Sequence, residues 1–237
     1  MKRTTPTRAL PAVLLVLAAA QVVSASAAGA APGLLGLLFP TPPPPASAQS
    51  PTQPAATTML QVEQQLAALH YDVGLVDGHT DDQTVSAIMA FQKVYGLERT
   101  GGLTNAVTTQ IMATRADPPA LVPGDPAANK VEVDLGRQVL FLYELGTLSK
   151  ILPVSTGTSR TPTPIGDFAV YRYDPGWHTS SLGRLYNAEY FVGGYAIHGS
   201  LSVPPVPASH GCIRIPMSAA EWFPDHVSRG TPVHVLA

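Results

Sequence analysis

Two proline-rich segments interrupt the chain and limit how much of it can fold together. The first covers residues 32–57 and includes four consecutive prolines at 42–45, and the second covers residues 115–128. Proline fixes φ and lacks an amide N–H, so such segments stay extended and bury no core. We therefore expect two linkers, a small module at 58–114 and a larger domain at 129–237.

The N-terminal residues 1–31 have the three parts of a secretory signal peptide. Lys2 and Arg3 provide a positively charged start, an apolar core follows at 11–23, and Ala25-Ser26-Ala27 offers a cleavage site. The apolar run is shorter than the roughly 20 residues that span a membrane. We therefore expect export with cleavage and only transient membrane contact through this segment; a retained membrane anchor is the alternative.

Charge and cysteine content narrow the classes of function. The formal net charge is -2 and no long basic run occurs, which argues against a nucleic-acid partner. Cys212 is the only cysteine in the 237 residues, so it cannot form an internal disulfide. In an exported chain a lone cysteine is a buried passenger, an intermolecular link or a working thiol.

The module at 58–114 has the pattern of three short helices. Thr58 with Gln61 and Thr80 with Gln83 match capping boxes, and Asn105 is in position to cap a third helix. Apolar residues recur at helical spacing on the first two segments: Val62, Leu66 and Leu69, then Ile88, Phe91 and Tyr95. These residues predict a small three-helix core.

From residue 129 onward the apolar period becomes that of β-strands. Alternation at 131–135 and an apolar run at 139–143 predict a mostly β domain, a mixed sandwich or barrel, so that the whole chain is an α+β multidomain protein. Residues 174–182 are expected to be irregular. One helix is expected after Ser218, which forms a capping box with Glu221.

The run Ser209-His210-Gly211-Cys212-Ile213-Arg214 carries the strongest chemical signal. A free thiol has a pKa of about 8.5 and needs a base or a positive environment to attack an acyl group. His210 is close in sequence but strained as an in-line base, whereas His198 can approach from an adjacent strand, so we favour His198 as the base. The carbonyl of Gly199 is then available to orient the imidazole.

Other residues of the run are expected to support this chemistry. The N–H groups of Gly211 and Cys212 can form an oxyanion hole, with His210 contributing beside it, and Arg214 can hold a substrate carboxylate next to Ser209. A zinc site of His198, His210 and Cys212 is an alternative that no paired-ligand spacing favours, so no metal is expected. The remaining histidines of the β domain are assigned to structural or surface positions: His178, His226 and His234.

The helical module resembles a known family. Val76-Asp77-Gly78 followed by Ala90-Phe91-Gln92 and Tyr95-Gly96-Leu97 is similar to the small peptidoglycan-binding domain of bacterial cell-wall hydrolases. The resemblance covers most of residues 58–114. It implies that the module anchors the protein to peptidoglycan glycan.

The β domain resembles the L,D-transpeptidase family, also called the YkuD-type catalytic domain. The resemblance rests on Ile197-His198-Gly199, on the run from Ser209 to Arg214, and on Thr163-Pro164-Ile165-Gly166-Asp167-Phe168. It implies a mostly β fold, Cys212 as nucleophile, His198 as proton acceptor, no cofactor, and inactivation by carbapenems. The chain departs from many members in a shorter, proline-stiffened interval between His198 and Ser209, and some members have asparagine at the position of Arg214.

These features together predict an exported enzyme of the periplasm or extracellular cell wall. The expected reaction joins two peptidoglycan stem peptides by a 3→3 cross-link through a thioester on Cys212. One alternative is an L,D-carboxypeptidase, in which water resolves the same acyl-enzyme. The other is a catalytically inert, wall-anchored binding protein.

Overall fold

A computed structural model describes residues 57–122 and 129–237. The predicted signal peptide and nearly all of the first predicted linker lie outside these residues. No helix among the described residues is long and apolar enough to cross a membrane. All of the described residues fall within one compact unit, 53–237.

The first described segment folds into three helices, as the apolar pattern predicts: α1 (Met59–Ala68), α2 (Asp82–Val94) and α3 (Asn105–Ala113). The capping box of Thr58 and Gln61 opens α1 and is confirmed. The other two predicted caps are wrong by one residue. Asp81, not Thr80, caps α2, because its carboxylate accepts the N–H of Thr84 over 2.7 Å. Thr104, not Asn105, caps α3.

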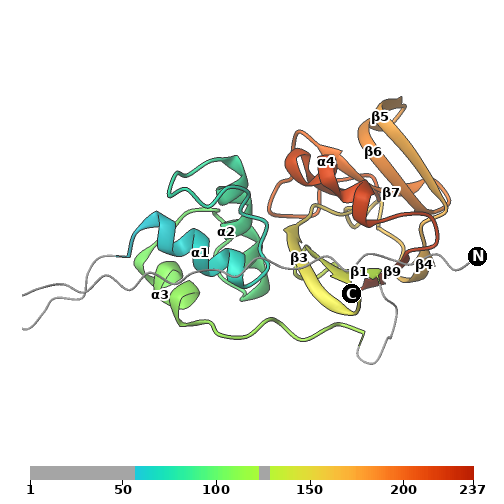
Figure 1. Cartoon of the computed structure of the whole chain (residues 1–237). Helices are drawn as coiled ribbons and strands as arrows, with labels where there is room; N and C mark the ends of the chain where they lie inside the picture. The colour runs from blue at the N-terminus through green and yellow to red at the C-terminus, as the bar shows by residue number, and fades with distance from the viewer. Residues whose placement is uncertain (1–56, 123–128) are drawn as a thin grey trace, which may run out of the picture. The chain divides into compact units, whose positions relative to one another are not determined.

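The β domain consists of two sheets and is not a closed barrel (Figure 1). The first sheet has the order β3-β2-β1-β9-β4, with strands β1 (Asn129–Asp134), β2 (Val139–Glu144), β3 (Thr147–Pro153), β4 (Gly166–Ala169) and β9 (Pro232–Leu236). The second has the order β5-β6-β7-β8, with strands β5 (Arg172–Ser180), β6 (Gly183–Val192), β7 (Tyr195–Ser200) and β8 (Ile213–Pro216). The predicted α+β class with a mostly β second domain is thereby confirmed.

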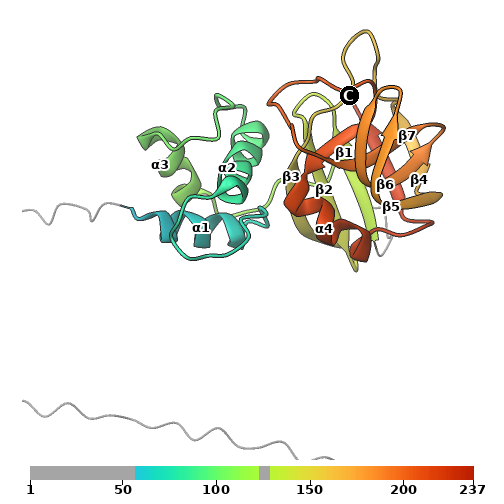
Figure 2. The same ribbon diagram turned by 90° about the horizontal axis from the view of Figure 1, so that it is seen from above.

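One helix, α4 (Met217–His226), packs beside β6 and β7 (Figure 2). Its apolar face joins the core between the sheets through Ala219, Ala220 and Phe223. The predicted capping box at Ser218 is not formed. The helix starts one residue earlier, with Pro216 at the N-cap and no side-chain hydrogen bond there.

The segment that was expected to be irregular, 174–182, belongs instead to a β-hairpin. Strands β5 and β6 are antiparallel, with a bulge between Asp174 and Trp177. The prediction was wrong because Pro175 and Gly176 are residues typical of loops. A β-bulge accommodates both of them without ending the strand.

The helical module and the first sheet share a hydrophobic cluster. Ile88 and Phe91 of α2 belong to the same buried cluster as Phe141 and Ile151. Ile151 also donates its backbone N–H to the carbonyl of His70 over 2.8 Å. Lys93, which is buried, donates from Nζ to the carbonyl of Val154 over 2.8 Å. The helices are thus packed and hydrogen-bonded to the β domain.

Candidate active site

Two adjacent parallel strands bring the histidine and the cysteine together. Strand β7 carries His198, and Cys212 immediately precedes β8; the register pairs His198 with Arg214. Side chains two residues apart on a strand share a face, and registered partners point to the same side of the sheet. His198, Cys212 and Arg214 therefore lie on one face, and all three line the same cavity.

The His198 imidazole is buried and held by the next residue of its own strand. Its Nδ1 lies 2.9 Å from the carbonyl oxygen of Gly199, which is the contact expected from the sequence. A carbonyl only accepts, so Nδ1 carries the proton and Nε2 is left with a lone pair. Burial lowers the pKa of His198, the Gly199 carbonyl opposes this change, and the Arg214 charge lowers the pKa further. At neutral pH the ring is uncharged and able to accept a proton.

Gly199 is required at its position by packing. A Cβ built there would lie 2.6 Å from Cβ of Ala220 on α4 and 3.2 Å from a ring carbon of Tyr186. Carbon atoms do not approach this closely without displacement of their neighbours. The glycine lets α4 pack directly on β7, and this packing fixes the strand that carries His198.

Burial favours the protonated form of the Cys212 thiol. Burial raises its pKa, and this exceeds the opposing effects of the Ala196 backbone N–H and the Arg214 charge. The Sγ atom is 3.9 Å from the carbonyl oxygen of Gly194. A thiol in this state needs a base to become a nucleophile, and the neutral His198 ring in the same cavity can serve as that base.

The backbone before Cys212 is fixed by hydrogen bonds within its own turn. The Ser209 hydroxyl accepts the N–H of Gly211 over 3.0 Å and donates to the carbonyl of Cys212 over 2.5 Å. The Gly211 carbonyl accepts the hydroxyl of Thr163 over 2.8 Å. Because the Gly211 N–H is already engaged, only the Cys212 N–H remains of the two donors that we expected for an oxyanion hole.

Gly211 also has a conformation that requires glycine. Its φ is 113°, and a Cβ there would lie 2.3 Å from the ring of Tyr195. The turn that delivers Cys212 therefore depends on both the hydroxyl of Ser209 and the absence of a side chain at Gly211.

The cavity that contains Cys212 has a volume of about 610 Å³. Five of the seven predicted site residues line it: Cys212, His198, His210, Ser209 and Arg214. The other two, Gly199 and Gly211, support it from behind through the backbone contacts described above. His210 is exposed at the cavity, in accord with a role other than the buried base.

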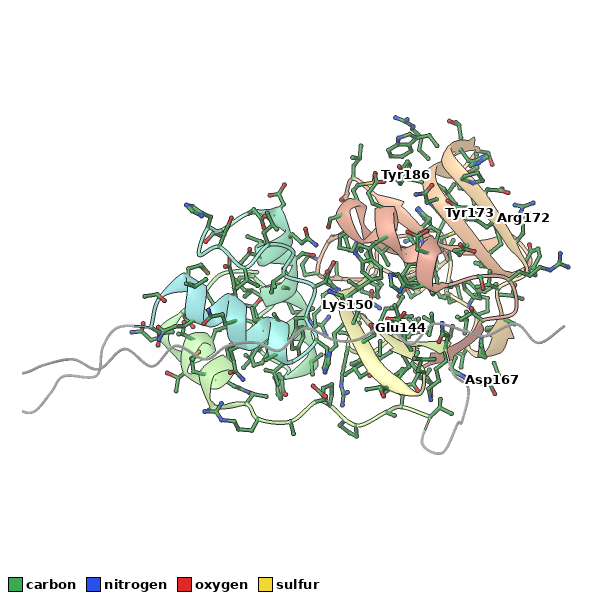
Figure 3. All side chains as sticks on the ribbon, viewed as in Figure 1. Glu144, Lys150, Asp167, Arg172, Tyr173 and Tyr186 are labelled. Carbon is green, nitrogen blue, oxygen red and sulfur yellow. The ribbon has the colours of Figure 1, made fainter. Side chains whose placement is uncertain are left out.

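The β5–β6 hairpin forms the wall that sequence reasoning missed. Trp177, Arg184 and Tyr190 line the cavity, and the Arg184 guanidinium lies 4.1 Å from the ring centroid of Trp177. Figure 3 shows Arg172, Tyr173 and Tyr186 on the same hairpin. Tyr186 packs against the core, whereas Tyr190 lines the cavity. The turn signal Ser180-Ser181-Leu182-Gly183 between two aromatic segments is the feature that predicts such a hairpin.

Other histidines occupy the structural or surface positions expected. His226 Nδ1 is 2.7 Å from Glu144, and His234 Nδ1 is 2.7 Å from Asp167. His178 lies on the exposed hairpin. Across residues 57–122 and 129–237, no group of three His, Cys, Asp or Glu side chains is placed to hold a metal ion.

Comparisons with known proteins bear on both modules. Residues 128–235 match the model of the YkuD-type L,D-transpeptidase catalytic domain, and residues 57–111 match the model of a peptidoglycan binding domain. Among curated proteins, none matches the chain. The L,D-transpeptidase of Xylanimonas cellulosilytica is 35% identical with a TM-score of 0.69, over 75% of this chain and 92% of that one.

More distant structures are also similar. The L,D-transpeptidase of Stackebrandtia nassauensis is 24% identical with a TM-score of 0.48, over 76% of this chain and 90% of that one. An L,D-transpeptidase solved in complex with imipenem is 24% identical with a TM-score of 0.42, over 46% of this chain and 59% of that one.

Proposed function

The chain belongs to the L,D-transpeptidase family, and from this premise we propose that it forms 3→3 cross-links in peptidoglycan by acyl transfer through Cys212. The observation that carries the proposal is the shared cavity of His198 and Cys212, with Nδ1 of His198 engaged by Gly199 and Nε2 left to accept a proton. A protonated thiol beside a neutral imidazole is the resting state of a base-assisted cysteine nucleophile.

The first step acylates the enzyme. His198 Nε2 accepts the thiol proton as Sγ attacks the carbonyl carbon of residue three of a tetrapeptide stem. The C–S bond forms, the C–N bond to the terminal D-residue breaks, and the departing amine takes the proton from His198. The Cys212 N–H is the proposed donor to the developing oxyanion.

The second step transfers the acyl group. The side-chain amine of residue three of another stem attacks the thioester, the C–N bond forms, and the C–S bond breaks. The amine gives a proton to His198, which returns it to Sγ and so restores the thiol. Arg214, with the Ser209 turn beside it, is the proposed contact for a substrate carboxylate, because a guanidinium can pair with both carboxylate oxygens.

The cellular setting follows from the modules. We propose that residues 1–31 direct export, that the module at 58–114 holds peptidoglycan glycan, and that residues 129–237 carry the catalysis in the periplasm or extracellular wall. The linker at 32–57 is then a spacer that precedes the two packed modules. We propose that carbapenems inhibit the enzyme, because an activated thiol can attack the carbonyl of their strained β-lactam ring and open it.

Intact-protein mass spectrometry tests this function. The wild-type chain is incubated with imipenem, and we expect one covalent adduct that maps to Cys212 and is absent from Cys212→Ala. With a tetrapeptide stem as sole substrate, cross-linked dimer supports transfer. Free tripeptide alone indicates the carboxypeptidase, and neither adduct nor product indicates the inert binding protein.

A further inference from the structure

A second cavity, of about 690 Å³, adjoins the Cys212 cavity. One wall is a face of α2, where Asp82, Val85, Ser86 and Met89 recur at helical spacing. The other wall belongs to the β domain and is formed by Pro153, Ser200, Leu201, Val203, Pro216 and Met217. Ser200 and Leu201 line both cavities, so the end of β7 and the first residue after it form a partition that the two share.

The two cavities have opposite charge. The lining of the Cys212 cavity includes Arg184 and Arg214 and no carboxylate. The lining of the second includes Asp81 and Asp82 and no lysine or arginine. Hydrogen bonds from Thr84, above all from its backbone N–H, hold the pKa of Asp81 below its usual range, so that this carboxylate stays charged at neutral pH. Cavities lined by one sign of charge concentrate ligands of the other sign.

The proposed transfer reaction uses two stem groups that differ in charge in the same way, even where donor and acceptor are the same peptide. The donor stem ends in a carboxylate, next to the bond that breaks. The acceptor stem must bring an amine, which is an ammonium group in water. We propose that the second cavity, between α2 and the Ser200–Leu201 partition, binds the amine-bearing acceptor stem; this inference rests on the proposed transpeptidase function. The peptidoglycan-binding module then contributes one wall of the acceptor site.

The carboxylates that attract the acceptor amine and the residues that react with it line different cavities. Asp81 and Asp82 act on the ammonium form as the stem approaches, which orients the peptide along α2. Attack requires the neutral amine, whose side chain must reach past Ser200 and Leu201 into the Cys212 cavity, where its proton passes to His198. The C–N bond then forms as the thioester C–S bond breaks, and no further reactant is needed.

Two variants of the full chain test the acceptor site by charge and by volume. Asp82→Lys reverses one charge, and Ser86→Trp fills the cavity. We expect each to lower the ratio of cross-linked dimer to tripeptide about five-fold or more, while the rate of the imipenem adduct on Cys212 changes less than about two-fold. Glu98→Lys makes the same charge change at an exposed position that lines neither cavity, and it should leave the ratio unchanged.

The outcomes distinguish this proposal from the proposed function. Absence of the imipenem adduct in wild type, or release of tripeptide alone, overturns the transferase and the acceptor site together. A normal dimer ratio in both variants overturns only the acceptor site. Calorimetric titration of Cys212→Ala with an amine-bearing tripeptide gives a readout without turnover: binding should weaken when Asp82→Lys is added, and equal binding would contradict the proposal.

Discussion

Arg99 donates a hydrogen bond from its guanidinium to the carbonyl oxygen of Pro205, over 3.1 Å. The same group donates to the carbonyl of Gly136 over 3.2 Å. Pro205 belongs to the loop that runs from the strand of His198 to the turn of Cys212, and Leu201 of that loop lines the cavity. A residue of the helical module thus holds the segment that separates the two reactive side chains in sequence.

Substitution of this arginine should weaken donor acylation. Arg99→Ala removes both hydrogen bonds. If the activation free energy of acylation rises by about 1 kcal/mol as a result, kcat/KM falls roughly five-fold. Arg99→Lys should recover part of it, because an ammonium can still reach one carbonyl. The matched control is Arg115→Ala, whose guanidinium donates to carbonyls of its own segment and, among the described residues, to no carbonyl of the β domain. The amide of Ala208, in the same loop as Pro205, donates to the carbonyl of Thr156. Its hydrogen exchange should accelerate only in the Arg99 variants. Unchanged exchange and kinetics would show that the Arg99 contact does not fix this loop.

Removal of the proposed base should nearly abolish acylation. His198→Gln retains a side-chain N–H for the Gly199 carbonyl but cannot take a proton, so adduct formation should slow by ~10²–10⁴-fold. His79→Gln serves as control, since its side chain is 85% exposed in the helical module. Rates are measured by rapid mixing with imipenem. A His198→Gln enzyme that reacts like wild type would assign the base elsewhere, and His210→Gln is the variant to examine next.

The acylation rate should stay constant as pH falls through the ordinary histidine range. His198 must be neutral to accept a proton, and burial lowers its pKa below the usual value of about 6.5. The acid limb of the kcat/KM profile should therefore lie below pH 6.5. Below that pH the unfolded chain binds a proton at His198 that the native protein does not, so the free energy of unfolding should fall as well. An acid limb above pH 6.5 would contradict the assignment.

A methyl group at Gly199 should destabilise the domain. The added Cβ meets Ala220 at 2.6 Å, and overpacking of this kind costs about 1–3 kcal/mol. Urea unfolding should show the loss, with slower acylation because the strand of His198 must move. Gly102→Ala is the matched control, since the nearest atom to its Cβ lies at 3.5 Å. Equal stability of the two variants would mean that α4 can shift away from β7 at little cost in free energy.

The local features of the fold were predictable where neighbours in sequence settle them. The capping box at Thr58 and the alternation at Val131 and Val133 were read correctly, because helix caps and strand faces depend on residues a few positions apart. The errors are of the same local kind. Thr80 and Asp81 both suit an N-cap, and the structure has Asp81 at this position. Pro175-Gly176 reads equally as a loop or as a bulge within β5.

The sequence by itself determined the chemical inventory: one thiol, His198 one strand away, and the family resemblance that the comparisons confirm. Only the tertiary structure decided what surrounds them. The β5–β6 wall, the engagement of the Gly211 N–H by Ser209 and the Arg99 contact with Pro205 join groups whose meeting depends on the packing of whole elements. Sequence spacing sets which residues share a strand or helix face, whereas packing of those faces sets which distant residues meet.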